Sequence, residues 1–66
     1  MQPKYKEMQR VRIVNGTQVG KVAVIRGEPI AAKVSQTWMY RVTILLDSAD
    51  WHYYEDELEG EDEAGE

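Results

Sequence analysis

Four short segments of this chain are predicted to be β-strands, and in residues 8–14 and 39–46 apolar and polar residues alternate with the period of two typical of half-buried strands. Residues 19–26 are instead an apolar run with four β-branched side chains, and residues 51–54 are mainly aromatic. The pattern is clearest in residues 39–46, where Tyr40, Val42 and Ile44 alternate with Arg41 and Thr43. The sequence therefore predicts a chain built mainly from antiparallel strands.

Turn residues separate these segments. Residues 15–17 (Asn-Gly-Thr) and 47–50 (Asp-Ser-Ala-Asp) are typical of tight turns. Residues 27–38 follow neither a strand nor a helix period, so we expect a long loop or a distorted hairpin arm there. Residues 55–58 (Glu-Asp-Glu-Leu) are interpreted as one helical turn, because acidic side chains suit the start of a helix.

The alternation also predicts which side chains form the core. The residues expected to face inward are Val11, Ile13, Val22, Val24, Tyr40, Val42 and Ile44. With 66 residues and no cysteine, the chain has room for one small domain without disulfides or thiolate metal sites. Closing the sheet on itself removes exposed edges, so we predict an all-β fold: a small SH3-like barrel of four to five antiparallel strands with one short helical turn near the C-terminus.

Composition shifts suggest three regions. Residues 1–7 are expected to form a flexible N-terminal arm, although Tyr5 could pack, and residues 8–59 form the barrel. Residues 60–66 (GEDEAGE) contain no bulky apolar side chain and are expected to be a disordered acidic tail.

The order of the segments resembles the SH3-like electron-transport accessory proteins, namely the photosystem I small stromal subunit, the ferredoxin–thioredoxin reductase variable chain and the nitrile hydratase β-subunit. The resemblance rests on RVRIVNGTQVGKVAVI (residues 10–25), a Gly-x-Pro-Ile-x-Ala loop, a Tyr-x-Val strand and the final Asp-Glu-Leu-Glu at residues 56–59. It implies an accessory subunit that docks on a larger protein. The chain departs from the pattern in lacking the long variable loops of those subunits and in its acidic tail.

A second segment resembles KOW-type ribosomal and transcription-factor modules. It consists of Val11-x-Ile13 followed by Gly16 and by Gly20-Lys21-Val22. This resemblance implies a nucleic-acid contact near residues 12–21.

Charge is segregated along the chain. Residues 1–46 hold all eight Lys and Arg and two acids, a balance of +6, whereas residues 47–66 hold ten acids and no Lys or Arg. If the alternating apolar residues face inward, four basic side chains face outward together with a bordering tryptophan. This candidate partner-binding set is Arg10, Arg12, Lys21, Trp38 and Arg41. Trp38 has a second interpretation, in which it caps the open end of the barrel.

The sequence offers little for catalysis or for a cofactor. There is no Cys nucleophile, no second histidine beside His52 and no glycine-rich phosphate loop. Trp51 and Tyr53 should face one side of a strand and His52 the other, which leaves too few ligands for a metal. We therefore expect no enzyme activity, no cofactor, no metal site and no small-molecule substrate.

These observations leave three hypotheses. The first is a non-enzymatic protein-interaction module or accessory subunit that docks an acidic partner through a basic strand face. The second is a KOW-like nucleic-acid-binding barrel whose acidic tail competes for the basic patch. The third is an acidic nucleic-acid mimic or inhibitor acting through residues 47–66. Without an apolar run of about 20 residues, no membrane partner is expected and the chain is interpreted as cytoplasmic; the sequence does not determine its oligomeric state.

Overall fold

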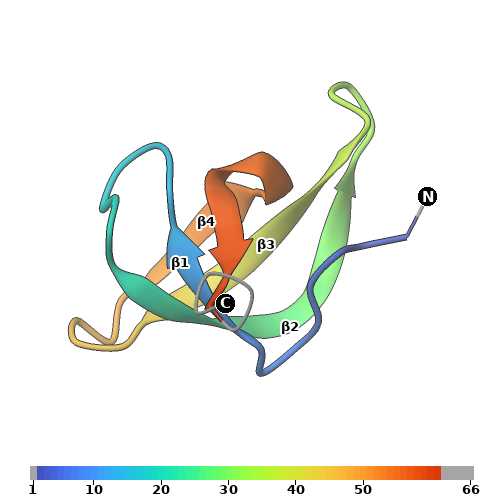
Figure 1. Ribbon diagram of the computed structural model, residues 1–66. Helices are drawn as coiled ribbons and strands as arrows, with labels where there is room; N and C mark the ends of the chain where they lie inside the picture. Colours follow the sequence, from blue (N-terminus) through green and yellow to red (C-terminus); the bar gives the residue numbers. More distant parts are fainter. Residues whose placement is uncertain (1, 62–66) are drawn as a thin grey trace.

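The computed structural model describes residues 2–61 and shows a single antiparallel sheet in the order β4-β3-β2-β1-β5 (Figure 1). A 3-10 turn, η1, precedes the last strand. The elements are β1 (Arg10–Ile13), β2 (Val22–Ala32), β3 (Thr37–Ile44), β4 (Asp50–Tyr54), η1 (Glu55–Glu57) and β5 (Leu58–Gly60). The predicted fold class is confirmed, including the short helical turn near the C-terminus.

The long strand β2 joins the two halves of the sheet. Its first part pairs with β1, and its whole length pairs with β3 through a register shift between Arg26 and Ile30. Gly27 lies at this shift with φ +75°, a left-handed conformation that glycine adopts without a steric penalty. Figure 1 shows the resulting curve, which carries β1 and β5 across β3 and β4.

The expected loop at residues 27–38 is therefore only partly right. Residues 27–32 continue β2, a turn occupies residues 33–36, and β3 begins at Thr37. The alternation was hidden because the bulge after Arg26 shifts its phase. Of the alternatives that the sequence left open, the distorted hairpin arm describes this region better than the long loop.

The core lies between the two halves of the bent sheet. Its residues are Tyr5, Val11, Ile13, Ala23, Ile25, Tyr40, Val42, Ile44, Tyr53 and Leu58. The prediction is confirmed for β1 and β3 but wrong for β2, where Ala23 and Ile25 are buried while Val22 and Val24 are half-buried. Val24 pairs with exposed Arg10 and therefore shares its outer face.

Tyr5 belongs to the core and is only 2% exposed. Its hydroxyl donates to the carbonyl oxygen of Leu58 at 3.1 Å, and its backbone N–H donates to the Tyr40 hydroxyl at 3.2 Å. The two tyrosine rings meet edge to face with centroids 5.5 Å apart. Residues 1–7 were expected to form a flexible arm in which Tyr5 could pack, and Tyr5 does pack, against Tyr40 of β3 and Leu58 of β5.

The turn after β1 packs closely against η1. Gly16 has φ +89°, and a Cβ atom there would lie 2.8 Å from Glu57 Oε2. The same Glu57 accepts the Tyr54 N–H through its side chain and the Val14 N–H through its carbonyl oxygen. The predicted turn is confirmed, and its positive φ is the reason that it requires glycine, because the Glu57 side chain could move away from a Cβ atom.

The C-terminal boundary differs slightly from the expectation. Gly60 is buried and ends β5, one residue beyond the expected end of the barrel, and Glu61 forms an ion pair with Arg10. The rest of the expected acidic tail, residues 62–66, lies outside the described residues.

Stability should fall in alkaline solution through Tyr40. Burial, together with the hydrogen bond that Tyr40 donates to Glu55, raises the pKa of the Tyr40 hydroxyl to about 12. The unfolded chain loses this proton near the ordinary pKa of about 10, so unfolding is favoured increasingly between these two values. Over that range we expect wild type to lose roughly 1.4 kcal/mol per pH unit relative to Tyr40→Phe.

The measurement is urea denaturation of both proteins at several pH values from neutral to strongly alkaline. The two proteins differ by one titrating hydroxyl, so the effect of all other titrating groups on the free energy of unfolding cancels when they are compared at the same pH. A constant difference in free energy of unfolding between the two proteins across this range would contradict the prediction.

Candidate functional site

Cross-strand register places three side chains in one row on the outer face of β2, β3 and β4. Arg26 lies opposite Arg41, and Arg41 lies opposite His52. All three side chains are exposed, because they alternate with the core residues Ile25, Tyr40 and Tyr53 on their strands. We call Arg26, Arg41 and His52 the cationic row.

The cationic row borders a shallow hollow at the bend of β2. Gly27, Glu28 and Ile30 complete its lining, and its volume is about 270 Å³. The Arg41 guanidinium lies close to the bend, since a Cβ atom at Gly27 would be 3.7 Å from Arg41 Nη2. The bend therefore forms one wall of the hollow, and two guanidinium groups face it.

The side chains of the cationic row are unpaired. Within residues 2–61, Arg26, Arg41 and His52 make no side-chain hydrogen bond or ion pair. Glu28 is the acid that lines the hollow, and it is exposed without an ion pair in the same range. The row is thus open to an external anionic group.

An apolar row runs beside the cationic row. Ile30 pairs with Met39, which pairs with Tyr54, so these three side chains share the same outer face. Ile30 is 51% exposed and Tyr54 is 40% exposed. Arginine beside exposed aromatic and aliphatic side chains is a composition typical of protein interfaces.

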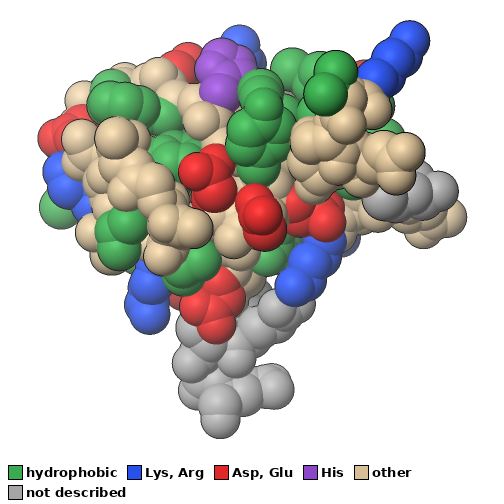
Figure 2. Space-filling model, turned by 90° about the horizontal axis from the view of Figure 1, so that it is seen from above, with side chains coloured by type: hydrophobic (Ala, Val, Ile, Leu, Met, Phe, Trp, Pro, Cys, Tyr) green, Lys and Arg blue, Asp and Glu red, His purple; other side chains and the backbone are tan. Residues whose placement is uncertain are grey.

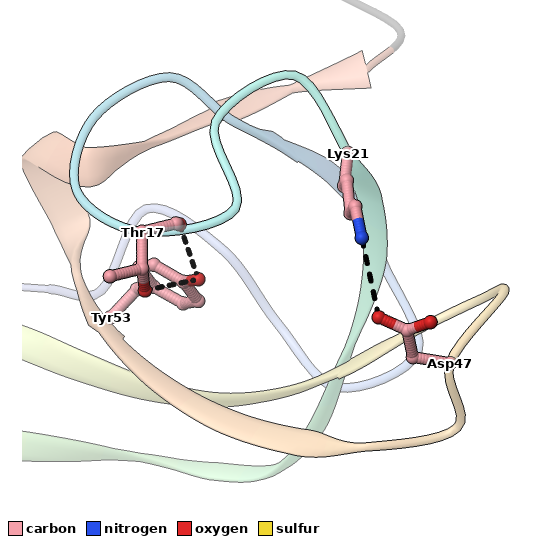
Figure 3. Close-up of polar contacts among 4 residues, drawn as sticks. All are labelled: Thr17, Lys21, Asp47 and Tyr53. Atoms are coloured by element: carbon pink, nitrogen blue, oxygen red, sulfur yellow. Dashed lines mark hydrogen bonds and ion pairs between the residues drawn. The ribbon is translucent and has the colours of Figure 1, made fainter.

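The structure divides the basic residues predicted from the sequence. Arg10 forms an ion pair with Glu61 at 3.1 Å, and Arg12 lies opposite Glu59 in the β1–β5 pairing. Lys21 forms an ion pair with Asp47 at 3.3 Å (Figure 3). Of the four, Arg41 alone belongs to the cationic row.

Trp38 lies on the opposite face from Arg41. It is half-buried and packs against the core, on the same side of β3 as Tyr40 and Val42. Of the two interpretations of this residue, packing against the core agrees with its position better than a place beside the basic side chains. Its indole Nε1 and that of Trp51 are buried without a hydrogen-bond partner within residues 2–61.

Arg26 and His52 were missing from the predicted set. The sequence did indicate that His52 faces away from Trp51 and Tyr53, which is confirmed: His52 is exposed and Tyr53 is buried. Tyr53 is held inside by its hydroxyl, which donates to the Thr17 carbonyl oxygen at 2.7 Å (Figure 3). Both residues lie beside Arg41 because of how β2, β3 and β4 pair residue by residue, and the sequence pattern does not reveal that pairing.

Acidic side chains gather on a different part of the surface. Figure 2 shows them in the middle of the face seen from above, with Lys and Arg side chains mainly near its margin. All three residues of η1 are acidic. Acidic side chains therefore gather around η1, whereas Glu28 lines the hollow and Glu59 lies opposite Arg12.

Two further features bear on the chemistry of the described chain. Within residues 2–61, no three or more His, Cys, Asp or Glu side chains are grouped so as to hold a metal ion. In the same residues, no helix has the length and apolar character needed to cross a membrane.

Comparison with known proteins gives no relative. No protein-family model, curated protein or solved structure matches this chain. The resemblances to electron-transport accessory subunits and to KOW modules therefore stay predictions from the sequence. What the chain does must be inferred from its own surface.

Proposed function

We propose that this chain is a non-enzymatic interaction module, or an accessory subunit, that docks an acidic protein through the outer face of β2, β3 and β4. The observation that carries the proposal is the unpaired cationic row beside the apolar row. The cationic row would bind carboxylates, and the apolar row would supply the buried part of the contact.

Electrostatic repulsion within the row supports this function. Like charges directly opposite on neighbouring strands destabilise a sheet, and Arg26 faces Arg41 in this way. A carboxylate between the two guanidinium groups would relieve the repulsion and could accept two parallel hydrogen bonds from one of them. Repulsion between Arg26 and Arg41 thus destabilises the isolated chain, and binding of a carboxylate would relieve it.

Protein docking also fits the size of the apolar row. A stable interface takes about 800 Å² from each partner, far more than three charged side chains provide. Ile30, Met39 and Tyr54 extend the surface across the same strands. The charged residues would then set orientation and association rate, while the apolar residues contribute affinity.

The nucleic-acid hypothesis gains less support from these contacts. Arg10 and Lys21 are paired with acids, Arg12 lies opposite Glu59, and the chain has a net charge of −4. Phosphates would also meet the acids of η1 on a neighbouring surface. This hypothesis and that of an acidic mimic remain predictions from the sequence.

Removing one charge of the row should stabilise the isolated protein. Arg41→Gln eliminates the repulsion with Arg26, so we expect the free energy of unfolding to rise by about 0.5 kcal/mol. Arg10→Gln is the control, because it removes an exposed ion pair and should lower stability by about 0–1 kcal/mol. Urea denaturation at ~0.01 M and ~1 M salt measures both, and the gain in Arg41→Gln should shrink at high salt.

A loss of stability in Arg41→Gln at both salt concentrations would contradict this account. It would mean that the guanidinium supports the bend at Gly27 more than it repels Arg26.

Charge reversal tests the docking itself. The double variant Arg26→Glu/Arg41→Glu should fail to retain the partner that wild type captures from a lysate of its own organism, because carboxylates would then repel. Lys6→Glu/Lys33→Glu is the control, since it changes net charge equally at exposed positions outside both rows. Quantitative mass spectrometry compares the captured proteins.

A photo-crosslinking amino acid at Tyr54 identifies the contact surface in the same experiment. Crosslinks should fall on partner segments that contain Asp or Glu. Equal capture by both double variants would refute the proposed face, and crosslinks to nucleic acid would favour the second hypothesis.

A further inference from the structure

The two edges of the sheet differ in how their backbone groups are satisfied. β5 is the edge strand at one end of the sheet and β4 is the edge strand at the other. At the β5 edge, Leu58 donates its N–H to the Glu55 carbonyl oxygen, and its own carbonyl oxygen accepts the Tyr5 hydroxyl. The N-terminal segment therefore covers part of this edge.

No segment among residues 2–61 covers the β4 edge in this way. The Ile44 N–H donates to the Ala49 carbonyl oxygen at 3.0 Å, which sets the hydrogen-bonding phase of the β3–β4 pair. By alternation, Trp51 and Tyr53 bond to β3, whereas the N–H and C=O groups of Asp50 and His52 point away from it. Tyr54, next in phase, uses its N–H to bond Glu57 Oε1.

The backbone N–H and C=O of His52 therefore point outward from the sheet edge. No backbone hydrogen bond from His52 to a segment beyond β4 occurs within residues 2–61. Exposed strand edges with this geometry pair readily with an extended chain, because such pairing supplies main-chain hydrogen bonds. The edge also lies at the end of the cationic row, since His52 belongs to both.

Charge along the edge selects the added chain. A residue paired with His52 would extend the row of Arg26, Arg41 and His52 by one position, where an acidic side chain is favoured. The position beside Asp50 disfavours a second acid, because like charges would then be neighbours. The preferred segment thus has one acidic residue flanked by neutral residues at alternate positions.

We propose that the free edge of β4 accepts an extended segment of the acidic partner as an added antiparallel strand, with a Glu or Asp beside His52. This inference rests on the proposed function and specifies the backbone conformation of the partner. Main-chain bonds to His52 provide attachment, and the acidic side chain sets the register.

The test uses three synthetic peptides with blocked ends. The first alternates valine with threonine and carries one central glutamate, and the second has glutamine in its place. The third keeps glutamate but is N-methylated there and at every second residue from it, which removes the donors along one edge. NMR titration of the full chain measures affinity, and hydrogen exchange measures protection of the His52 amide.

We expect the glutamate peptide to bind and to slow exchange of the His52 amide. The N-methylated peptide should bind roughly tenfold more weakly or not at all, because it loses main-chain hydrogen bonds. The glutamine peptide should retain protection of the His52 amide at lower affinity. In wild type, equal binding of the methylated peptide, absence of His52 protection or absence of binding by the glutamate peptide would each overturn strand addition.

Variants at the edge give a second readout. His52→Pro removes an N–H that points away from β3, a position where an edge strand tolerates proline, and should abolish binding of the glutamate peptide. His52→Gln keeps the N–H and should retain binding with less preference for glutamate over glutamine. Thermal unfolding verifies that His52→Pro folds, and if it does not, the three peptides with wild type decide the question.

The two proposals fail separately. If charge reversal at Arg26 and Arg41 releases the partner but the His52 amide is never protected, docking occurs by side chains alone. If the peptide adds as a strand while charge reversal leaves partner capture unchanged, the edge binds extended chains but the proposed docking face is wrong.

Discussion

The bend of β2 is the constraint on which the rest of the structure depends. One strand must pair with β1 on one side and with β3 on the other, while its buried side chains stay inside. The register shift after Arg26 and the left-handed backbone of Gly27 make this possible. The same bend forms the wall of the hollow and brings Arg41 beside it, so the geometry that closes the core also shapes the candidate site.

The sequence predicted a strand and its buried face correctly only where polar and apolar residues alternate. In β1 and β3, arginine and threonine alternate with apolar side chains, so both the strand and its inner face were identifiable. In β2, Val22, Ala23, Val24 and Ile25 are all apolar, and nothing in the pattern tells the two faces apart. Tyr5 was equally ambiguous, because a single aromatic in a polar segment has no period.

The candidate site was harder to predict than the fold for a related reason. A basic face was expected. Which residues form it depends on the pairing across strands and on which Lys and Arg side chains form ion pairs with acidic residues. Arg41 was identified, whereas Arg26 and His52 join it only through the register of three strands. Arg10 and Lys21 are not available to a partner in the same way, because they form ion pairs with Glu61 and Asp47, which are distant in the sequence. The segregated charges of the sequence thus partly neutralise each other on folding, and Arg26 and Arg41 remain together beside His52 on the outer face.

The pairing of β1 with β5 has a consequence for synthesis on the ribosome. Val11 pairs with Gly60, and the carbonyl group that binds the Tyr5 hydroxyl belongs to Leu58. β1 therefore waits for β5, which is made much later, before its second edge and the hydrogen bond between Tyr5 and Leu58 are complete. Contacts between such distant residues slow folding, because loop closure must precede the stabilisation that they bring. Until β5 pairs with it during synthesis, β1 therefore presents one unpaired strand edge, the geometry that associates readily with other extended chains.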